Sequence, residues 1–258
     1  MDVKYTLSGF IYITPEDDCH KIVDVMLETD YNEEFCISDK FDPEFIAKLM
    51  EAGFLVMSMN ITNDEAGSLP EDPPPEPFYI LLPKLHLVRS VLFFENLHIK
   101  RSIRRFIKAG GASYELRADA EFDYIVDRCV EKHGCDWLTP PLIDCIKRIR
   151  RGEGVKQLPD KSSNSLIPTE CPYPASFALY KDGKLVAGEF GVVCGKVYTS
   201  YSGFYEEDNT GTMQIILTTH YLQENGFSIF DMGMPLDYKT DLGAVEISPE
   251  EFVALFRG

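Results

Sequence analysis

The sequence predicts a mixed α/β fold whose organising part lies between residues 175 and 244. This stretch is expected to hold a hairpin, a third strand, a helix and a last short strand, at residues 177–180, 184–193, 196–204, 212–222 and 227–231. The first two strands flank Asp182-Gly183, a dipeptide typical of tight hairpins, and the apolar residues of the helix recur with helical spacing. Asp231 ends the last strand, where α/β sheets bind their ligands.

This order of elements is typical of an acyltransferase-type α/β domain. Further strands are expected at 8–14, 54–59, 78–82 and 87–94, and helices at 15–28, 43–52, 98–108, 119–133, 140–151 and 249–256. Asp42 before Pro43 and Ser248 before Pro249 are expected helix caps. An acidic, proline-rich stretch at 63–77 predicts a linker or exposed loop, which gives a small N-terminal domain at 1–77 and a larger domain at 78–258.

Composition excludes several classes of protein. A chain of 258 residues with 45% hydrophobic content is long enough to bury a core, and it has no apolar run near twenty residues, so we expect no membrane partner. The N-terminus has neither a basic region nor a cleavable apolar segment, and the seven scattered cysteines show no zinc-binding spacing. Reduced thiols, no metal site and a cytoplasmic location are therefore expected.

Charge is unevenly distributed along the chain. The formal net charge of −17 argues against nonspecific binding to nucleic acid, and no DNA partner is expected. Two islands are basic: residues 98–108 carry five lysines and arginines with no acid, and residues 147–156 carry five with a single glutamate. These islands could steer a polyanion to one face of an otherwise acidic molecule, although helices with solvated charged faces give the same pattern.

Several short segments together resemble one family. The stretch LHIKRSIRRF at 97–106 resembles the LHI-x-RS-x-x-RF signature of leucyl/phenylalanyl-tRNA–protein transferases. Weaker matches keep the order of the family and fall at 52–54, 136–139, 185–192, Asp231 and 241–244. The chain therefore resembles this family over most of its length.

The resemblance implies a small N-terminal domain followed by an acetyltransferase-like (GNAT-like) α/β domain. Members of the family move an amino acid from the 3′ end of a charged tRNA to the N-terminal amine of a protein, so aminoacyl-tRNA and protein N-termini are the expected partners. No cofactor is expected, because aminoacyl-tRNA is itself the co-substrate. Acetyl-CoA is not expected either, since the sequence has no Q/R-x-x-G-x-G/A loop for its pyrophosphate.

The resemblance also implies which residues act in catalysis. Asp231 falls on the strand-end aspartate of the family and is expected to hold and relay the proton that the attacking amine loses. The active-site glutamate of the family corresponds to Tyr201, the second catalytic candidate, and its glutamine corresponds to Gly233. Two of the three side chains are therefore replaced. An Asp231 that only caps the following turn is the competing interpretation.

The predicted aminoacyl pocket differs from that of the family. Leucine- and phenylalanine-specific members line it with methionines, where this chain has Glu189 and Gly203, and Phe204 completes the predicted pocket. A carboxylate pairs well with a guanidinium but poorly with leucine. We therefore expect arginine as the donor amino acid, then lysine, and otherwise leucine or phenylalanine. A Glu189 on a solvated strand face would remove this argument.

For tRNA, the resemblance points to the first basic island. Arg101, Arg105 and Lys108 fall on basic positions of the family, and their i, i+4, i+7 spacing puts them on one helix face that suits backbone phosphates. Trp137 matches a family tryptophan near the 3′-terminal adenosine, where an aromatic ring can stack on a base. A solvated helix and a core tryptophan are the competing interpretations.

The sequence therefore predicts an aminoacyl-tRNA–protein transferase that tags proteins for degradation in an N-degron pathway. The alternative is a catalytically silent descendant that binds tRNA or protein N-termini as an adaptor, because two family side chains are replaced. A CoA-dependent acetyltransferase is a third interpretation, which the missing pyrophosphate loop disfavours.

Overall fold

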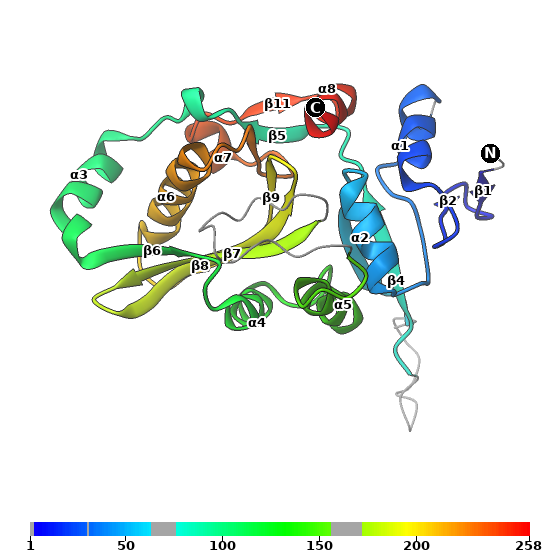
Figure 1. Cartoon of the computed structure of the whole chain (residues 1–258), viewed down its shortest axis with the longest axis horizontal. Helices are drawn as coiled ribbons and strands as arrows, with labels where there is room; N and C mark the ends of the chain where they lie inside the picture. The colour runs from blue at the N-terminus through cyan, green and yellow to red at the C-terminus, as the bar shows by residue number, and fades with distance from the viewer. Residues whose placement is uncertain (1–2, 30, 63–75, 156–171) are drawn as a thin grey trace, which may run out of the picture.

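A seven-stranded, mostly antiparallel sheet forms the centre of the fold (Figure 1). The computed structural model of the chain describes residues 3–29, 31–62, 76–155 and 172–258. The strand order is β11-β5-β10-β9-β8-β7-β6, in which β10 runs parallel to β9 and the other neighbouring pairs are antiparallel. The predicted mixed α/β class is confirmed.

The strands of this sheet differ greatly in length. The three longest are β7 (Tyr173–Lys181), β8 (Lys184–Cys194) and β9 (Val197–Tyr205), and the others are β5 (Arg89–Leu92), β6 (Tyr114–Ala118), β10 (Ile229–Asp231) and β11 (Val245–Ile247). The predicted hairpin between β7 and β8 is confirmed, because Asp182 and Gly183 have φ values of 49° and 80°. Since β10 lies between β9 and β5, Asp231 has neighbours from both strands.

Helices cover both faces of the sheet (Figure 1). On one face lies α6 (Thr210–Glu224), and on the other lie α4 (Phe122–His133) and α5 (Pro140–Arg150). The remaining helices are α1 (Cys19–Glu28), α2 (Pro43–Glu51), α3 (Arg101–Gly110), α7 (Asp237–Asp241) and α8 (Pro249–Arg257), with 3₁₀ turns at Phe94–Asn96 and Gly111–Ser113. Within the described ranges, none of the helices combines the length and apolarity that a membrane span requires.

The part of the chain from β1 through β4, which we call the N-terminal part, packs against the seven-stranded sheet through a shared core. Its strands form two small pairs, β1 (Lys4–Tyr5) with β2 (Ile11–Tyr12) and β3 (Leu55–Asn60) with β4 (Tyr79–Lys84). One buried apolar cluster includes Ile46 of α2, Ile146 of α5 and Phe190 of β8. The side chains of this cluster therefore hold the two parts together.

The predicted domain division stays a prediction. The strand β4 follows the boundary expected at residue 77, yet it pairs with β3, which precedes that boundary. Most of the predicted linker at 63–77, and most of the surface loop expected at 152–174, lies outside the described residues.

Some element boundaries differ from those expected, for local reasons. α1 begins at Cys19 rather than at residue 15, because the Asp17 carboxylate accepts hydrogen bonds from the N–H and hydroxyl of Thr14 and closes a separate turn. α4 begins at Phe122 rather than at residue 119, because Asp119 and Glu121 both have positive φ, of 58° and 54°. The caps at Asp42 and Ser248 are confirmed. The short elements β6, α7 and β11 are not anticipated by the sequence pattern.

Two of the segments that carry the family resemblance dock on each other. The His98 N–H donates to the Leu242 carbonyl at 2.9 Å, and Lys100 pairs with Asp241 at 2.5 Å. Gly243 has a φ of 95°, and a Cβ placed there would lie 2.0 Å from the carbonyl oxygen of Asn96. Only glycine allows this close approach, so this contact anchors the start of α3.

Candidate active site

The candidate site is built around a buried ion pair between Asp231, at the end of β10, and Arg89, at the start of β5. The Arg89 Nε donates to Asp231 Oδ1 at 3.0 Å and its Nη2 donates to Oδ2 at 2.6 Å, which is a bidentate geometry. The Arg89 side chain is 1% exposed and the Asp231 side chain is 0% exposed. Because β10 and β5 are antiparallel neighbours, the sheet itself brings the two residues together.

This ion pair ties three further segments to the end of β10. Asp231 also accepts hydrogen bonds from the Thr199 hydroxyl at 2.7 Å and from the Gly233 N–H at 3.0 Å. On the other side, Arg89 Nη1 donates to the Gly53 carbonyl at 3.1 Å. We call Asp231, Arg89, Thr199 and Gly233 together the Asp231 site.

The Asp231 carboxylate is held in its ionised form. Burial acts to raise its pKa, but the Arg89 guanidinium and the hydrogen bonds from Gly233 and Thr199 outweigh burial, so the pKa is lowered. A carboxylate that accepts four hydrogen bonds and has a lowered pKa is a weak proton acceptor. The geometry therefore favours a positioning role for Asp231, and its Gly233 bond is also the contact that a turn cap makes. The predicted proton relay stays a prediction.

Arg89 is the residue of this candidate site that the sequence analysis does not single out. It is the one cation in the apolar stretch expected as a strand at 87–94, and a buried cation requires a partner. That signal is present in the sequence. Its partner, however, lies 142 residues further along the chain, and neither segment by itself predicts that β5 pairs with β10.

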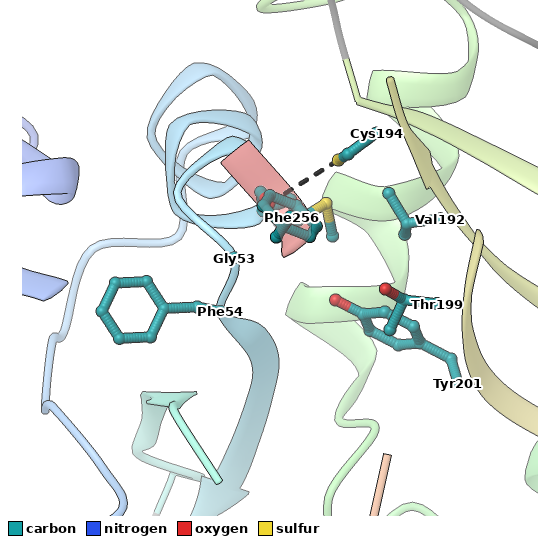
Figure 2. A pocket seen from close by; sticks show the side chains of 8 residues that line it. Gly53, Phe54, Val192, Cys194, Thr199, Tyr201 and Phe256 are labelled. Atoms are coloured by element: carbon teal, nitrogen blue, oxygen red, sulfur yellow. Dashed lines mark hydrogen bonds between the residues drawn. The ribbon is translucent and has the colours of Figure 1, made fainter. Parts of the chain in front are cut away.

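A small pocket opens beside the Asp231 site, between the sheet and the N-terminal part (Figure 2). Residues from α2, the α2–β3 turn, β8, β9 and α8 line it, namely Met50, Gly53, Phe54, Val192, Cys194, Thr199, Tyr201 and Phe256. Thr199 belongs both to the pocket wall and to the Asp231 site. The interior has room for about one water-sized group, so an amino-acid side chain would enter only after rearrangement.

Tyr201 lines this pocket and connects the sheet to the N-terminal part. Its hydroxyl accepts a hydrogen bond from the Val56 N–H of β3 at 3.1 Å. The centre of its ring lies 6.4 Å from that of Trp137, which is half-buried. Burial raises the pKa of the Tyr201 hydroxyl, so the phenol is neutral at neutral pH. Tyr201, Trp137 and the Asp231 site thus lie on the same side of the sheet.

Glu189 lies on the other face of the sheet, under α6. Its side chain is only 4% exposed, which excludes the solvated strand face. The Ser200 hydroxyl donates to Oε2 at 3.2 Å, whereas Oε1 has no hydrogen-bond partner among the described residues. Burial raises the pKa of this carboxyl to about 7, although Gln214, Ser200 and Tyr198 act to lower it. Glu189 is thus a buried carboxyl group with unused hydrogen-bonding capacity.

The three residues of the predicted aminoacyl pocket are not all brought together. Gly203 is the direct partner of Glu189 in the β8–β9 pair, and a Cβ at Gly203 would lie 3.1 Å from the Glu189 Cβ. The missing side chain therefore leaves space for the glutamate. Phe204 lies on the face of the sheet that α4 covers, opposite to the α6 face of Glu189, and it is buried in the core cluster there. The Arg128 guanidinium lies 5.5 Å from the centre of its ring. Glu189 and Gly203 are neighbours, and Phe204 is separated from them by the sheet.

Glu189→Gln is expected to change the pH dependence of stability. The raised pKa of Glu189 stabilises the fold below about pH 4.3, the ordinary pKa of glutamate, and this stabilisation is lost as pH rises through about 7. The variant should therefore match the wild type near pH 4 and exceed its unfolding free energy at pH 8, by an amount on the order of 3 kcal/mol. Denaturant titrations at both pH values measure the difference. If the difference in unfolding free energy between the variant and the wild type were the same at both pH values, the raised pKa that burial gives Glu189 would be contradicted.

The two basic islands differ in whether their cations form ion pairs. In the second island the four cations within the described residues are ion-paired: Lys147 with Asp127, Arg148 with Asp144 and Glu153, Arg150 with Asp119, and Arg151 with Asp123. In α3, Arg101, Arg105 and Lys108 are exposed, and none of them forms an ion pair with any residue that the structure describes. This helix face therefore presents three uncompensated positive charges to solvent.

Comparison with known proteins gives the family. A family profile described as "Leucyl/phenylalanyl-tRNA protein transferase" matches residues 91–257. Proteins named leucyl/phenylalanyl-tRNA–protein transferase are 27% identical in Pseudomonas entomophila, 25% in Hahella chejuensis and 25% in Aeromonas hydrophila, over 64%, 65% and 64% of this chain. The matches span 65%, 64% and 63% of those relatives, somewhat less than two thirds. The chain belongs to the leucyl/phenylalanyl-tRNA–protein transferase family.

Likeness to solved structures is weaker. The structure of L-PGS from Bacillus licheniformis is similar over 91% of this chain and 68% of that chain, with a TM-score of 0.36 and 12% identity. Such a score does not establish a common fold.

Proposed function

We propose that this protein transfers an amino acid from aminoacyl-tRNA to the N-terminal amine of a protein, and so tags proteins in an N-degron pathway. Membership of the family is the observation that carries the proposal. The aminoacyl ester is already activated, so holding the ester and the amine in place supplies much of the rate. Because an N-terminal amine has a pKa of about 8, a modest proton acceptor is sufficient.

In this proposal the Asp231 site and Tyr201 have different tasks. Asp231 keeps Thr199 and the chain at Gly233 in fixed positions beside the pocket. Tyr201 accepts a hydrogen bond from Val56, while its own O–H proton has no acceptor among the described residues. That proton is available for an oxyanion, which forms when the amine attacks the ester carbonyl.

Arginine is the donor amino acid that Glu189 supports best. Oε1 and the nearby hydroxyl of Tyr198 form no hydrogen bond of ordinary geometry in the described part of the chain, although Tyr198 is close enough to lower the pKa of Glu189, and both oxygens could accept hydrogen bonds from a guanidinium. Guanidinium binding would stabilise the carboxylate form and remove the cost of leaving these atoms unpaired. Since Glu189 is 4% exposed and lies under α6, on the opposite face of the sheet from Tyr201 and the Asp231 site, the donor side chain would reach it only if the groups that cover it and separate the two places rearrange.

The free cations of α3 are the proposed contacts to the tRNA backbone. Arg101→Ala combined with Arg105→Ala should weaken tRNA binding at least tenfold and lower the slope of log affinity against log salt by about 1.5, because two phosphate contacts are lost. A titration from 50 to 200 mM salt checks both effects.

The control for this pair is Arg148→Ala with Arg151→Ala, which removes the same charge from the ion-paired island. Its affinity and salt slope should stay close to those of the wild type. Equal losses in both double variants would show that net charge alone, and not the face of α3, governs binding.

No cofactor is included in the proposal, and acetyl-CoA is not a substrate. Among the described residues, no three His, Cys, Asp or Glu side chains are grouped as a metal site requires. We assign the larger domain to a GNAT-like fold and the protein to the cytoplasm, where charged tRNA is found. Both assignments rest on the family.

The second candidate function is a binding adaptor without catalysis. It is favoured by Tyr201 and Gly233, which stand where the family carries a glutamate and a glutamine. Turnover of charged tRNA separates the candidates, because an adaptor binds aminoacyl-tRNA and leaves the ester intact.

A further inference from the structure

Lys239 of α7 is a buried lysine whose side chain reaches the end of β10. It is 6% exposed, and its Nζ donates to the carbonyl of Met234 at 2.7 Å and also to the carbonyl of Met232. These two carbonyls flank Gly233, whose N–H is bound to Asp231. One ammonium group therefore closes the loop at 232–234 that continues from the Asp231 site.

The charge of Lys239 sits among other buried titratable groups. Asp231 and Glu189 both act to raise its pKa, but burial outweighs them and lowers it to about 8. Burial lowers the pKa of His86 to about 3, with further lowering by Arg89, Lys84 and, least, Lys239, and its Nδ1 has no partner in the described ranges. The Tyr238 ring of α7 lies 5.8 Å from the Nζ.

Burial of the Lys239 ammonium group carries a free-energy cost of desolvation that an uncharged hydrogen-bond donor at the same place would avoid. Lys239 nevertheless keeps its charge within electrostatic reach of two buried carboxyl groups, Asp231 on one face of the sheet and Glu189 on the other. The charge itself therefore needs a role.

We propose that Lys239 is a positioning residue for aminoacyl transfer: its charged side chain holds the 232–234 loop, and with it the Gly233–Asp231 hydrogen bond, in the geometry of the site. The inference rests on the proposed function for its effect on rate. The effect on the loop is independent of any activity, so the two are tested separately.

The first test is amide hydrogen exchange of the segment 229–236 in wild type, Lys239→Met and Lys239→Arg at pH 7. Methionine keeps the length of the side chain but removes the donor, so exchange at Gly233 should be about tenfold faster. Arginine keeps charge and donors and should stay within about threefold of wild type. Lys184→Met, at an exposed lysine that begins β8, is the matched control and should leave this segment unchanged. Unaltered exchange in Lys239→Met would overturn the proposal, even for a protein without transferase activity.

The second test is the pH profile of transfer between pH 6.5 and 9.5. The wild-type rate should rise as the acceptor amine loses its proton and fall above about pH 8, as Lys239 loses its own. Lys239→Arg should lack the falling limb, because arginine keeps its charge throughout this range. Lys239→Met should also lack the falling limb, with kcat about 100-fold below the wild type at pH 7, a difference that narrows above pH 8, and a smaller change in KM. A falling limb shared by wild type and Lys239→Arg, or wild-type kcat in Lys239→Met, would contradict the role.

Discussion

Arg89→Met is expected to lower the free energy of unfolding by about 3–5 kcal/mol at pH 7. The reason is that the substitution leaves the Asp231 carboxylate, with 0% of its side chain exposed, without its counterion. It also removes the donor to the Gly53 carbonyl, so the N-terminal part loses one connection to the sheet. Denaturant titration of the wild type and the variant measures the loss directly.

The same variant should show an inverted dependence on pH. In the wild type the lowered pKa of Asp231 contributes stability above about pH 3.9, the ordinary value, and this contribution is lost as pH falls through the still lower folded pKa. Without Arg89, burial raises that pKa, and the protein is relatively more stable when the carboxyl is protonated. The difference between Arg89→Met and wild type should therefore shrink between pH 7 and pH 4.

An exposed ion pair provides the control for this experiment. Arg148→Met removes the exposed ion pairs that Arg148 of α5 forms with Asp144 and Glu153, and it should lower the free energy of unfolding by less than about 1 kcal/mol. Asp231→Asn should be destabilising by the mechanism of Arg89→Met, abolish transfer, and leave tRNA affinity within about twofold of wild type. A loss below about 1 kcal/mol in Arg89→Met would mean that the ion pair does not hold the site together.

The second large effect concerns the donor amino acid. Glu189→Met should lower arginine transfer about 100-fold, because the guanidinium loses a charged hydrogen-bond partner worth roughly 3 kcal/mol. The same substitution replaces the buried carboxyl group under α6 by an apolar side chain, so leucine and phenylalanine transfer should rise. Parallel assays with arginyl-, leucyl- and phenylalanyl-tRNA on one acceptor peptide measure the switch.

Glu246→Met is the matched control for the donor experiment, since Glu246 is an exposed glutamate of β11. It should leave all three rates unchanged. Loss of activity toward every donor in Glu189→Met would assign Glu189 to the stability of the sheet instead. An unchanged preference would place the donor side chain elsewhere.

Local sequence signals predicted much of the fold, because they depend on neighbouring residues. The Asp182-Gly183 hairpin and the Asp42 and Ser248 caps are confirmed, since each is decided within a few positions of the chain. The predicted start of α1 at residue 15 is wrong because of another local contact. The Asp17 carboxylate accepts hydrogen bonds from Thr14 and forms a separate turn before the helix.

The site was only half visible in the sequence, because its contacts cross the whole chain. Asp231 could be found from its place at the end of a strand, but its partner Arg89 lies 142 residues away. Lys239 lies in a five-residue helix with no strong pattern, and its role becomes apparent only when its side chain is seen on the carbonyls of Met232 and Met234. The division of Glu189 and Phe204 between two faces likewise follows from packing against α6 and α4, which strand periodicity alone does not supply.

Donor choice and activity are measured together by transfer of radiolabelled arginine, lysine, leucine and phenylalanine from their tRNAs to peptides that begin with Asp, Glu, Arg or Lys. We expect arginine on the peptides with acidic N-termini, with lysine transferred less. Transfer of leucine or phenylalanine alone would contradict the role of Glu189 in donor choice. Binding of charged tRNA without transfer of any of the four amino acids would contradict the enzyme and leave the adaptor.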